Sequence, residues 1–148
     1  RPDWAKVELS PATLASVNWQ DPAQAKAWLE TNAMLLHPSG CNLLEVDADA
    51  KSLGVPFDSP ELLPKTIAAL QQEKTKAVAA TLLARYVNGG GPGDDTAAWT
   101  KWWRENGAYV FYSELGCYRW YIDPLAKKRG IPTKDLRGPA RADIALVR

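Results

Sequence analysis

The chain has 148 residues, of which 46% are hydrophobic and 24% are charged, as in an ordinary globular protein. Its formal net charge of +1 excludes a global field that would attract nucleic acid or an anionic membrane. No apolar run approaches the roughly 20 residues of a membrane-spanning helix. This length predicts a single compact domain, 1–148. The chain begins at Arg1 without Met, which indicates a processed product or part of a larger protein.

An internal repeat is the main organising feature of the sequence. Residues 40–56 align with residues 116–132, and the identical residues are Gly, Cys, Asp, Ala, Lys, Gly and Pro. Chance would give about one identity over such a stretch, so the pattern predicts a duplication. The match extends upstream, where Trp28 aligns with Trp102 and Asn32 with Asn106. We therefore expect copy one at about 21–56 and copy two at about 95–132.

Each copy predicts a helix, a β-hairpin and a short helix. The first helices begin at an Asp cap and are expected at about 22–32 and 95–106, with the aligned tryptophans as core anchors. The hairpin strands are expected at 33–37 with 41–46, and at 108–112 with 117–122. The short helices, 48–53 and 124–129, are each capped by an Asp and ended by a Gly, which explains Asp47 and Asp123 as caps.

A helix pair is predicted between the two copies, at about 59–88, with helices at 60–72 and 76–87. A glycine-rich loop, 88–93, ends it and is interpreted as a plain connector. A further short helix is expected at 10–14, and another within 133–148. Together these elements predict an α+β fold that is mainly helical.

One segment resembles a known class of repeats. The helix ending in Leu82–Tyr86, the glycine loop and the stretch Trp99–Asn106 resemble the ends of HEAT-type helical repeats in large multidomain bacterial proteins. The resemblance covers Ser59–Asn106, about a third of the chain. It implies contact with another protein and no chemistry.

Function is predicted to be non-catalytic binding of a protein or a polymeric ligand, within a larger protein. The candidate binding surface is the hairpin of copy two, where Tyr109, Tyr112, Arg119 and Tyr121 are expected to face outward together while Tyr118, Trp120 and Ile122 face the core. Copy one has Leu43 and Glu45 at the equivalent positions, so the two copies are not expected to bind the same ligand. Binding of carbohydrate by the same surface is a variant of this hypothesis.

Two other classes of function stay open. A small enzyme would use the single histidine, His37, with Cys41, or a pair from the carboxylates Glu45, Asp47, Asp49 and Glu114. His37 and Cys41 supply two ligands where zinc needs three or four, so no metal and no cofactor are expected. A nucleic-acid-binding module would use the basic C-terminal part, which from Arg119 onward has 8 basic and 3 acidic side chains.

The two cysteines, Cys41 and Cys117, occupy equivalent positions of the two copies. Two hypotheses stay open for them: two buried free thiols, or a Cys41–Cys117 disulfide, which their equivalence favours and which would be worth about 4 kcal/mol in the chain-entropy model. Such a bond would favour an extracytoplasmic location, periplasmic or secreted.

Overall fold

The computed structural model describes residues 8–39 and 43–133, and its fold is α+β and mainly helical, as the sequence predicts. Backbone contacts divide the chain into a first unit, Arg1–Phe57, and a second unit, Asp58–Arg148, where the sequence predicts a single domain. The boundary directly follows copy one. The helix pair between the copies belongs to the second unit because its helices pack on elements of copy two.

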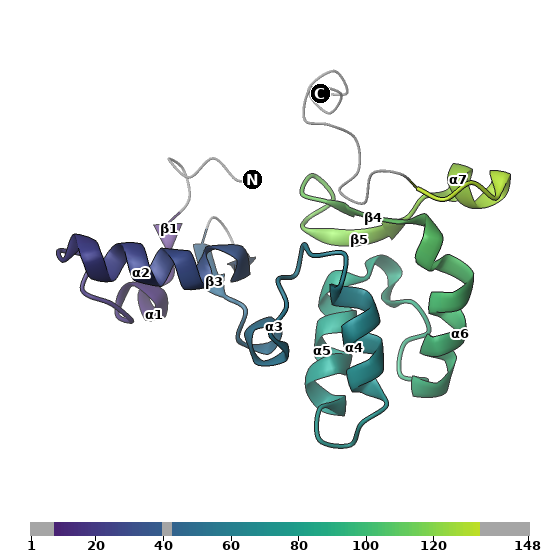
Figure 1. Ribbon diagram of the computed structural model, residues 1–148, viewed down its shortest axis with the longest axis horizontal. Coiled ribbons are helices and arrows are strands. Elements are labelled where there is room, and N and C mark those ends of the chain that lie inside the picture. Colours follow the sequence, from purple (N-terminus) through teal and green to yellow (C-terminus); the bar gives the residue numbers. More distant parts are fainter. Residues whose placement is uncertain (1–7, 40–42, 134–148) are drawn as a thin grey trace. The chain divides into compact units, whose positions relative to one another are not determined.

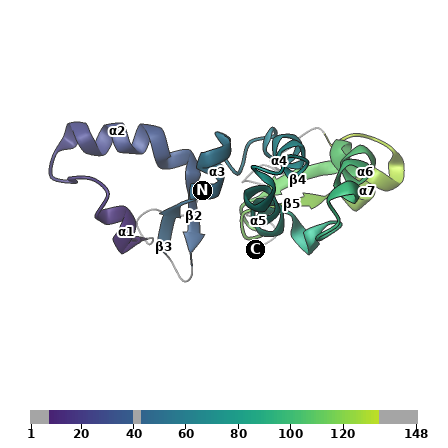
Figure 2. The ribbon, with the colours of Figure 1, turned by 90° about the horizontal axis from the view of Figure 1, so that it is seen from below.

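Within residues 8–39 and 43–57, the first unit contains a small three-stranded sheet and three helices (Figures 1 and 2). In the sheet, β3 lies between a parallel β1 and an antiparallel β2. In Figure 2, α2 forms one side of this unit and the hairpin lies on the opposite side. The elements in chain order are β1 (Glu8–Leu9), α1 (Pro11–Leu14), α2 (Pro22–Asn32), the 3-10 turn η1 (Ala33–Leu35), β2 (Leu36–Ser39), β3 (Leu43–Val46) and α3 (Ala48–Leu53).

The second unit contains four helices, two 3-10 turns and a two-stranded antiparallel hairpin within its described part. Figure 1 shows α4 and α5 side by side, and α4 also packs against α6. The elements in chain order are α4 (Leu62–Leu70), α5 (Lys76–Tyr86), η2 (Asn88–Gly90), α6 (Thr96–Asn106), η3 (Gly107–Tyr109), β4 (Val110–Ser113), β5 (Arg119–Ile122) and α7 (Pro124–Arg129).

The helix starts are set by the aspartates that the sequence identifies as caps. Asp21, Asp47, Asp95 and Asp123 each accept hydrogen bonds from backbone N–H groups in the first turn of the following helix. The short helices α3 and α7 end at glycines with left-handed backbones, at φ of 70° and 66°. The interpretation of Asp47 and Asp123 as capping residues is therefore confirmed.

Several boundaries differ from the prediction by one to three residues. The strands begin at Leu36 and Val110 because η1 and η3 occupy the three residues after each preceding helix. The helix after Ser59 begins at Leu62, since residues 59–61 form a turn. The helix expected within 133–148 falls almost wholly outside the described residues. In the part of the chain that the structure describes, no helix has the length and apolarity to cross a membrane.

The two units share an order of elements that begins before the predicted copies. In the first unit Leu9 pairs in parallel with Leu44 of β3. In the second unit Val87 forms a parallel bridge with Trp120 of β5, the residue that aligns with Leu44. Each unit therefore has, in the same order, a short parallel strand or bridge, a helix, a 3-10 turn, a hairpin and a short helix, with α1 or η2 between the first two.

The tryptophan anchors differ from expectation. Trp28 and Trp102 are only half-buried, whereas Trp99 of α6 is 1% exposed. The Trp99 indole N–H donates to the Gly93 carbonyl at 3.0 Å, and a Cβ at Gly91 would overlap the Trp99 ring. The glycine-rich loop is therefore more than a plain connector, because it closes over a buried indole.

Candidate interaction surface

The β4–β5 hairpin has one face in the core and one face outward. Its pairing places Tyr112 opposite Trp120, and these side chains are 3% and 2% exposed with ring centroids 5.7 Å apart. The expectation that Tyr112 faces outward with Arg119 and Tyr121 is therefore wrong. Side chains alternate along a strand, so the residue opposite the buried Trp120 also points into the core.

The outward face is built on a stacked aromatic pair. Phe111 lies opposite Tyr121, and their rings are 5.9 Å apart at an interplanar angle of 22°. The Tyr121 hydroxyl donates to the Gly116 carbonyl at 2.6 Å, and a Cβ at Gly116 would overlap the Tyr121 ring. Gly116 thus lets the tyrosine ring lie directly on the hairpin loop. Because the hydroxyl is bonded to the loop, this ring is held in place before any partner binds.

Arg119 and Tyr109 complete the placement of the predicted residues. Arg119 begins β5 opposite Ser113, on the same face as Phe111 and Tyr121, and is half-exposed. Tyr109 is also half-exposed but lies in η3, and its carbonyl accepts a hydrogen bond from the Asp123 N–H at 2.7 Å. The structure therefore brings together Arg119, Tyr121 and Phe111 on one face. Phe111 is not among the residues predicted for this surface, although Phe111 lies two residues from Tyr109 in an alternating stretch.

The hairpin loop, residues 114–118, exposes an apolar tip and holds an unusual backbone. Cys117 and Tyr118 both have left-handed backbones, at φ of 62° and 59°, a conformation that costs a non-glycine residue about 1–2 kcal/mol. The Ser113 hydroxyl oxygen accepts from the Gly116 N–H at 2.9 Å, and Leu115 is exposed beside it. Burial raises the pKa of Tyr118, and the charges of Glu114 and Cys117 raise it further.

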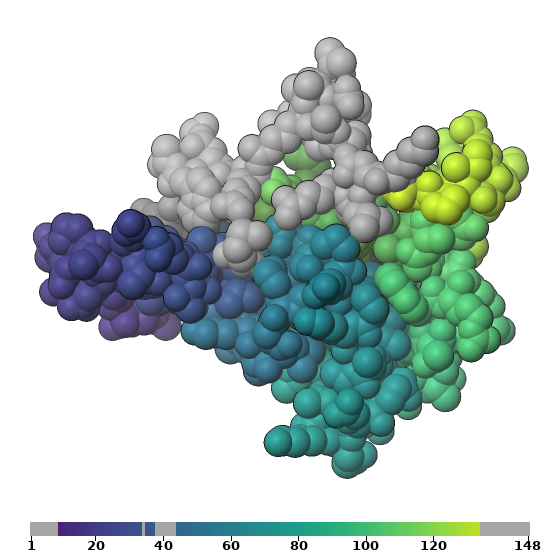
Figure 3. Space-filling view, viewed as in Figure 1, coloured from purple at the N-terminus to yellow at the C-terminus, as the bar shows by residue number. Residues whose placement is uncertain are grey.

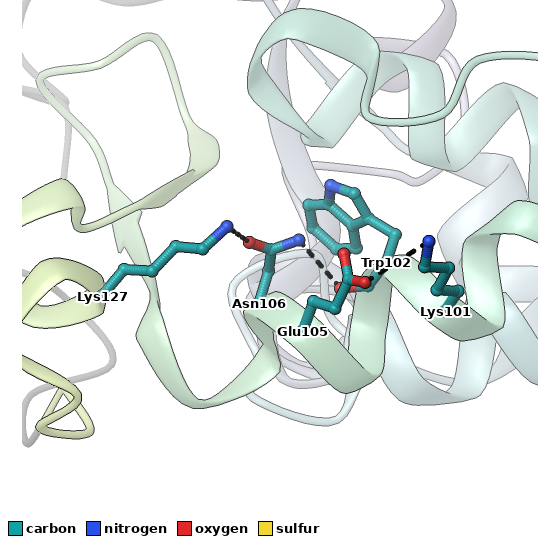
Figure 4. A network of polar contacts seen from close by, with 5 residues as sticks. All are labelled: Lys101, Trp102, Glu105, Asn106 and Lys127. Carbon is teal, nitrogen blue, oxygen red and sulfur yellow. Dashed lines mark hydrogen bonds and ion pairs between the residues drawn. The ribbon is translucent and has the colours of Figure 1, made fainter.

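A lysine–asparagine contact holds α7 against the end of α6 (Figure 4). The Lys127 Nζ donates to the Asn106 side-chain oxygen at 2.7 Å, and the Asn106 amide donates to the Trp102 carbonyl at 2.9 Å. The first unit has the same arrangement, in which Lys51 donates to Asn32 at 2.9 Å and Asn32 to the Trp28 carbonyl at 3.0 Å. We call each set the Lys–Asn latch. It fixes the short helix that follows each hairpin.

The residues proposed for catalysis are dispersed or already engaged. Asp47 is 1% exposed and caps α3, and His37 lies opposite Glu45 on the hairpin of the first unit. Among residues 8–39 and 43–133, no group of three or more His, Cys, Asp or Glu side chains is placed to hold a metal ion. The enzyme hypothesis stays a prediction.

Of the basic residues proposed for nucleic-acid binding, one is engaged in a contact within the chain and others are exposed. Lys127 belongs to a latch, while Lys128 and Arg129 are exposed at the end of α7. Cations in the last turn of a helix also stabilise the helix itself. The other candidates, Lys134, Arg137 and Arg141, lie outside the described residues.

The proposed disulfide is not tested by the structure. Cys117 is exposed, while Cys41 lies outside the described residues. The Cys41–Cys117 bond stays a prediction.

Comparison of the chain with models of known protein families, with curated proteins and with solved structures gave no match in any of the three. The HEAT-type resemblance of Ser59–Asn106 therefore also stays a prediction.

Proposed function

We propose that the chain is a non-catalytic polypeptide-binding module that uses the outward face of the β4–β5 hairpin. The observation that carries the proposal is the stacked Phe111–Tyr121 pair, which is half-exposed and shares its face with Arg119. Aromatic and Arg side chains dominate the binding energy of protein interfaces, and aromatic rings bury large areas while losing little side-chain entropy. The exposed Leu115 at the loop extends this surface with an apolar contact.

The partner that suits this face is a peptide segment with an aromatic or aliphatic side chain and a carboxylate. The apolar side chain would pack on Phe111, and the carboxylate would accept hydrogen bonds from the Arg119 guanidinium. The bond from Tyr121 to Gly116 fixes one ring in advance, which lowers the entropy lost on binding.

We also infer that the two units arose by duplication and that one of them acquired this binding face. The shared order of elements, the capping aspartates and the two Lys–Asn latches support common descent. At the positions of Phe111 and Tyr121 the first unit has His37 and Glu45. The two hairpins would therefore select different partners.

Selection of peptides from a random library on the immobilised chain tests the binding function. We expect enriched peptides to share an apolar residue and an acidic residue, and Phe111→Ser or Arg119→Ala to weaken their binding about tenfold, or about 1.4 kcal/mol. The matched control is His37→Ser, at the equivalent position of the first unit, which should leave binding unchanged. The proposal fails if no peptide is enriched, or if the hairpin variants and the control bind equally.

A further inference from the structure

A different surface of the molecule, on the first unit, emerges from comparing α2 with α6. The two helices hold equivalent places in the order of elements, but they differ in how far other elements of their unit cover them. In the second unit α4 packs against α6, and the Gln71 side-chain amide donates to the Thr96 carbonyl at its start. In the first unit Asn32 is the buried residue of α2. Leu29 on α2 is 42% exposed.

An aromatic substitution gives α2 a pair of tryptophan rings like the pair on α6. Where α6 has Trp99, α2 has Ala25, but Trp19 from the preceding loop supplies a ring in its place. Trp19 meets Trp28 edge-on at 5.2 Å and 68°, and Trp99 meets Trp102 edge-on at 5.1 Å and 64°. The Trp19 indole N–H donates to the Leu14 carbonyl at the end of α1 at 2.9 Å, and the Trp99 indole N–H donates to the Gly93 carbonyl in the glycine-rich loop at 3.0 Å.

The two tryptophan pairs differ in how far their rings are exposed to water. Trp99 is 1% exposed, whereas Trp19 is half-buried. Leu14, whose carbonyl accepts the Trp19 indole N–H, is 49% exposed. The result is an apolar patch, hereafter the α1–α2 patch, that comprises Leu14, Trp19, Trp28 and Leu29. In Figure 3 the segments that carry these residues, α1 and α2, are coloured purple to blue.

We propose that the α1–α2 patch docks an amphipathic helix of a partner polypeptide, in the place that α4 occupies against α6. The helix α4 shows the chemistry that such a site takes, because it buries Leu62, Leu63, Ile67 and Leu70 along its length. Residues 1–57 contain 4 basic and 7 acidic side chains, so Lys or Arg beside the apolar stripe favours binding. This surface is separate from the hairpin face of the proposed function.

A labelled peptide tests the docking site on the full chain. The probe is a fluorescent synthetic peptide with the sequence of residues 58–74, which contains α4, carrying Glu61→Lys and Glu73→Lys, and its control is the same peptide with Leu63→Ser and Ile67→Ser added, which leaves the charge unchanged. We expect saturable binding of the probe by fluorescence anisotropy, with a dissociation constant between about 1 µM and about 1 mM, and none of the control peptide. Tryptophan emission should shift to shorter wavelength as Trp19 and Trp28 lose contact with water.

Variants of the patch separate it from other apolar sites. Leu29→Lys and Leu14→Lys each replace an exposed side chain and should weaken binding at least about tenfold. The matched control is Leu125→Lys in α7, where the leucine is 60% exposed in the second unit, and it should bind as the parent does. The inference is overturned if the probe does not saturate, if the control peptide binds equally, or if both patch variants bind as Leu125→Lys does.

Discussion

The Lys–Asn latch of the second unit gives the sharpest prediction about stability. Asn106→Ala removes the acceptor of the Lys127 ammonium and the donor to the Trp102 carbonyl, from a residue that is 4% exposed. A neutral side-chain hydrogen bond is worth about 1 kcal/mol, and one to a charged group about 1.5–3 kcal/mol. Because the Lys127 ammonium lies at the surface and is hydrated again in the variant, we expect the free energy of unfolding to fall by about 2 kcal/mol, near the lower end of the two contributions together.

Differential scanning calorimetry of the full chain measures this effect. In a unit of this size, about 2 kcal/mol corresponds to a fall in melting temperature of about 10 °C. Amide hydrogen exchange should rise first in α7, which the latch holds. The double variant with Lys127→Met should lose about 1 kcal/mol less than the sum of the single variants, since both remove the same bond.

A neighbouring lysine supplies the control. Lys128→Met changes the next side chain of α7, which is exposed, and should lower the melting temperature much less, because it removes only a charge from the helix end and no hydrogen bond of the latch. Strictly additive effects, or an Asn106→Ala variant as stable as the parent, would show that the latch does not fix α7.

Three further predictions concern the loops of the second unit. Gly91→Ala should destabilise the chain by about 2 kcal/mol in denaturant unfolding, because its φ is 50° and the new Cβ would overlap Trp99; an unchanged midpoint would contradict this close approach. In an ultraviolet titration Tyr118 should ionise above its ordinary pKa of 10.0, and Glu114→Gln should lower that pKa. The contribution of the Tyr118 hydroxyl to stability is thus present below pH 10.0 and is lost as the pH rises through its pKa in the folded chain. A Tyr118→Phe chain with the same alkaline titration would contradict the assignment of the raised pKa to Tyr118. Finally, the predicted Cys41–Cys117 disulfide should protect both thiols from alkylation without reductant, and an intact mass with two alkylated thiols would exclude the bond.

The local elements could be predicted because each has a chemical start and stop in the sequence. Asp–Pro pairs begin α2 and α7, and glycines with left-handed backbones end α3 and α7. These signals act within a few residues, so they survive without knowledge of the tertiary fold. The division into two units was not predictable in the same way. It depends on which copy the helices α4 and α5 pack against.

The residues of the candidate site could be predicted only in part from the sequence. Arg119 and Tyr121 lie on the outward face as predicted, but Tyr112 does not, because the register sets it opposite the buried Trp120, while Tyr109 lies in the 3-10 turn η3 before the strand. The sequence also contains a signal for the two Lys–Asn latches. Asparagine and lysine are identical in both copies, at 32 and 106 and at 51 and 127, and only the structure shows that they bond to each other.

The two tryptophan pairs also imply different folding behaviour for the two units. Trp99 and Trp102 are three residues apart on one helix, so their contact forms as soon as a turn of α6 forms. Trp19 and Trp28 meet only after the segment between α1 and α2 closes, and loop closure carries an entropic cost that must be met before the contact stabilises anything. We therefore expect ring packing to precede tertiary assembly in the second unit and to follow loop closure in the first.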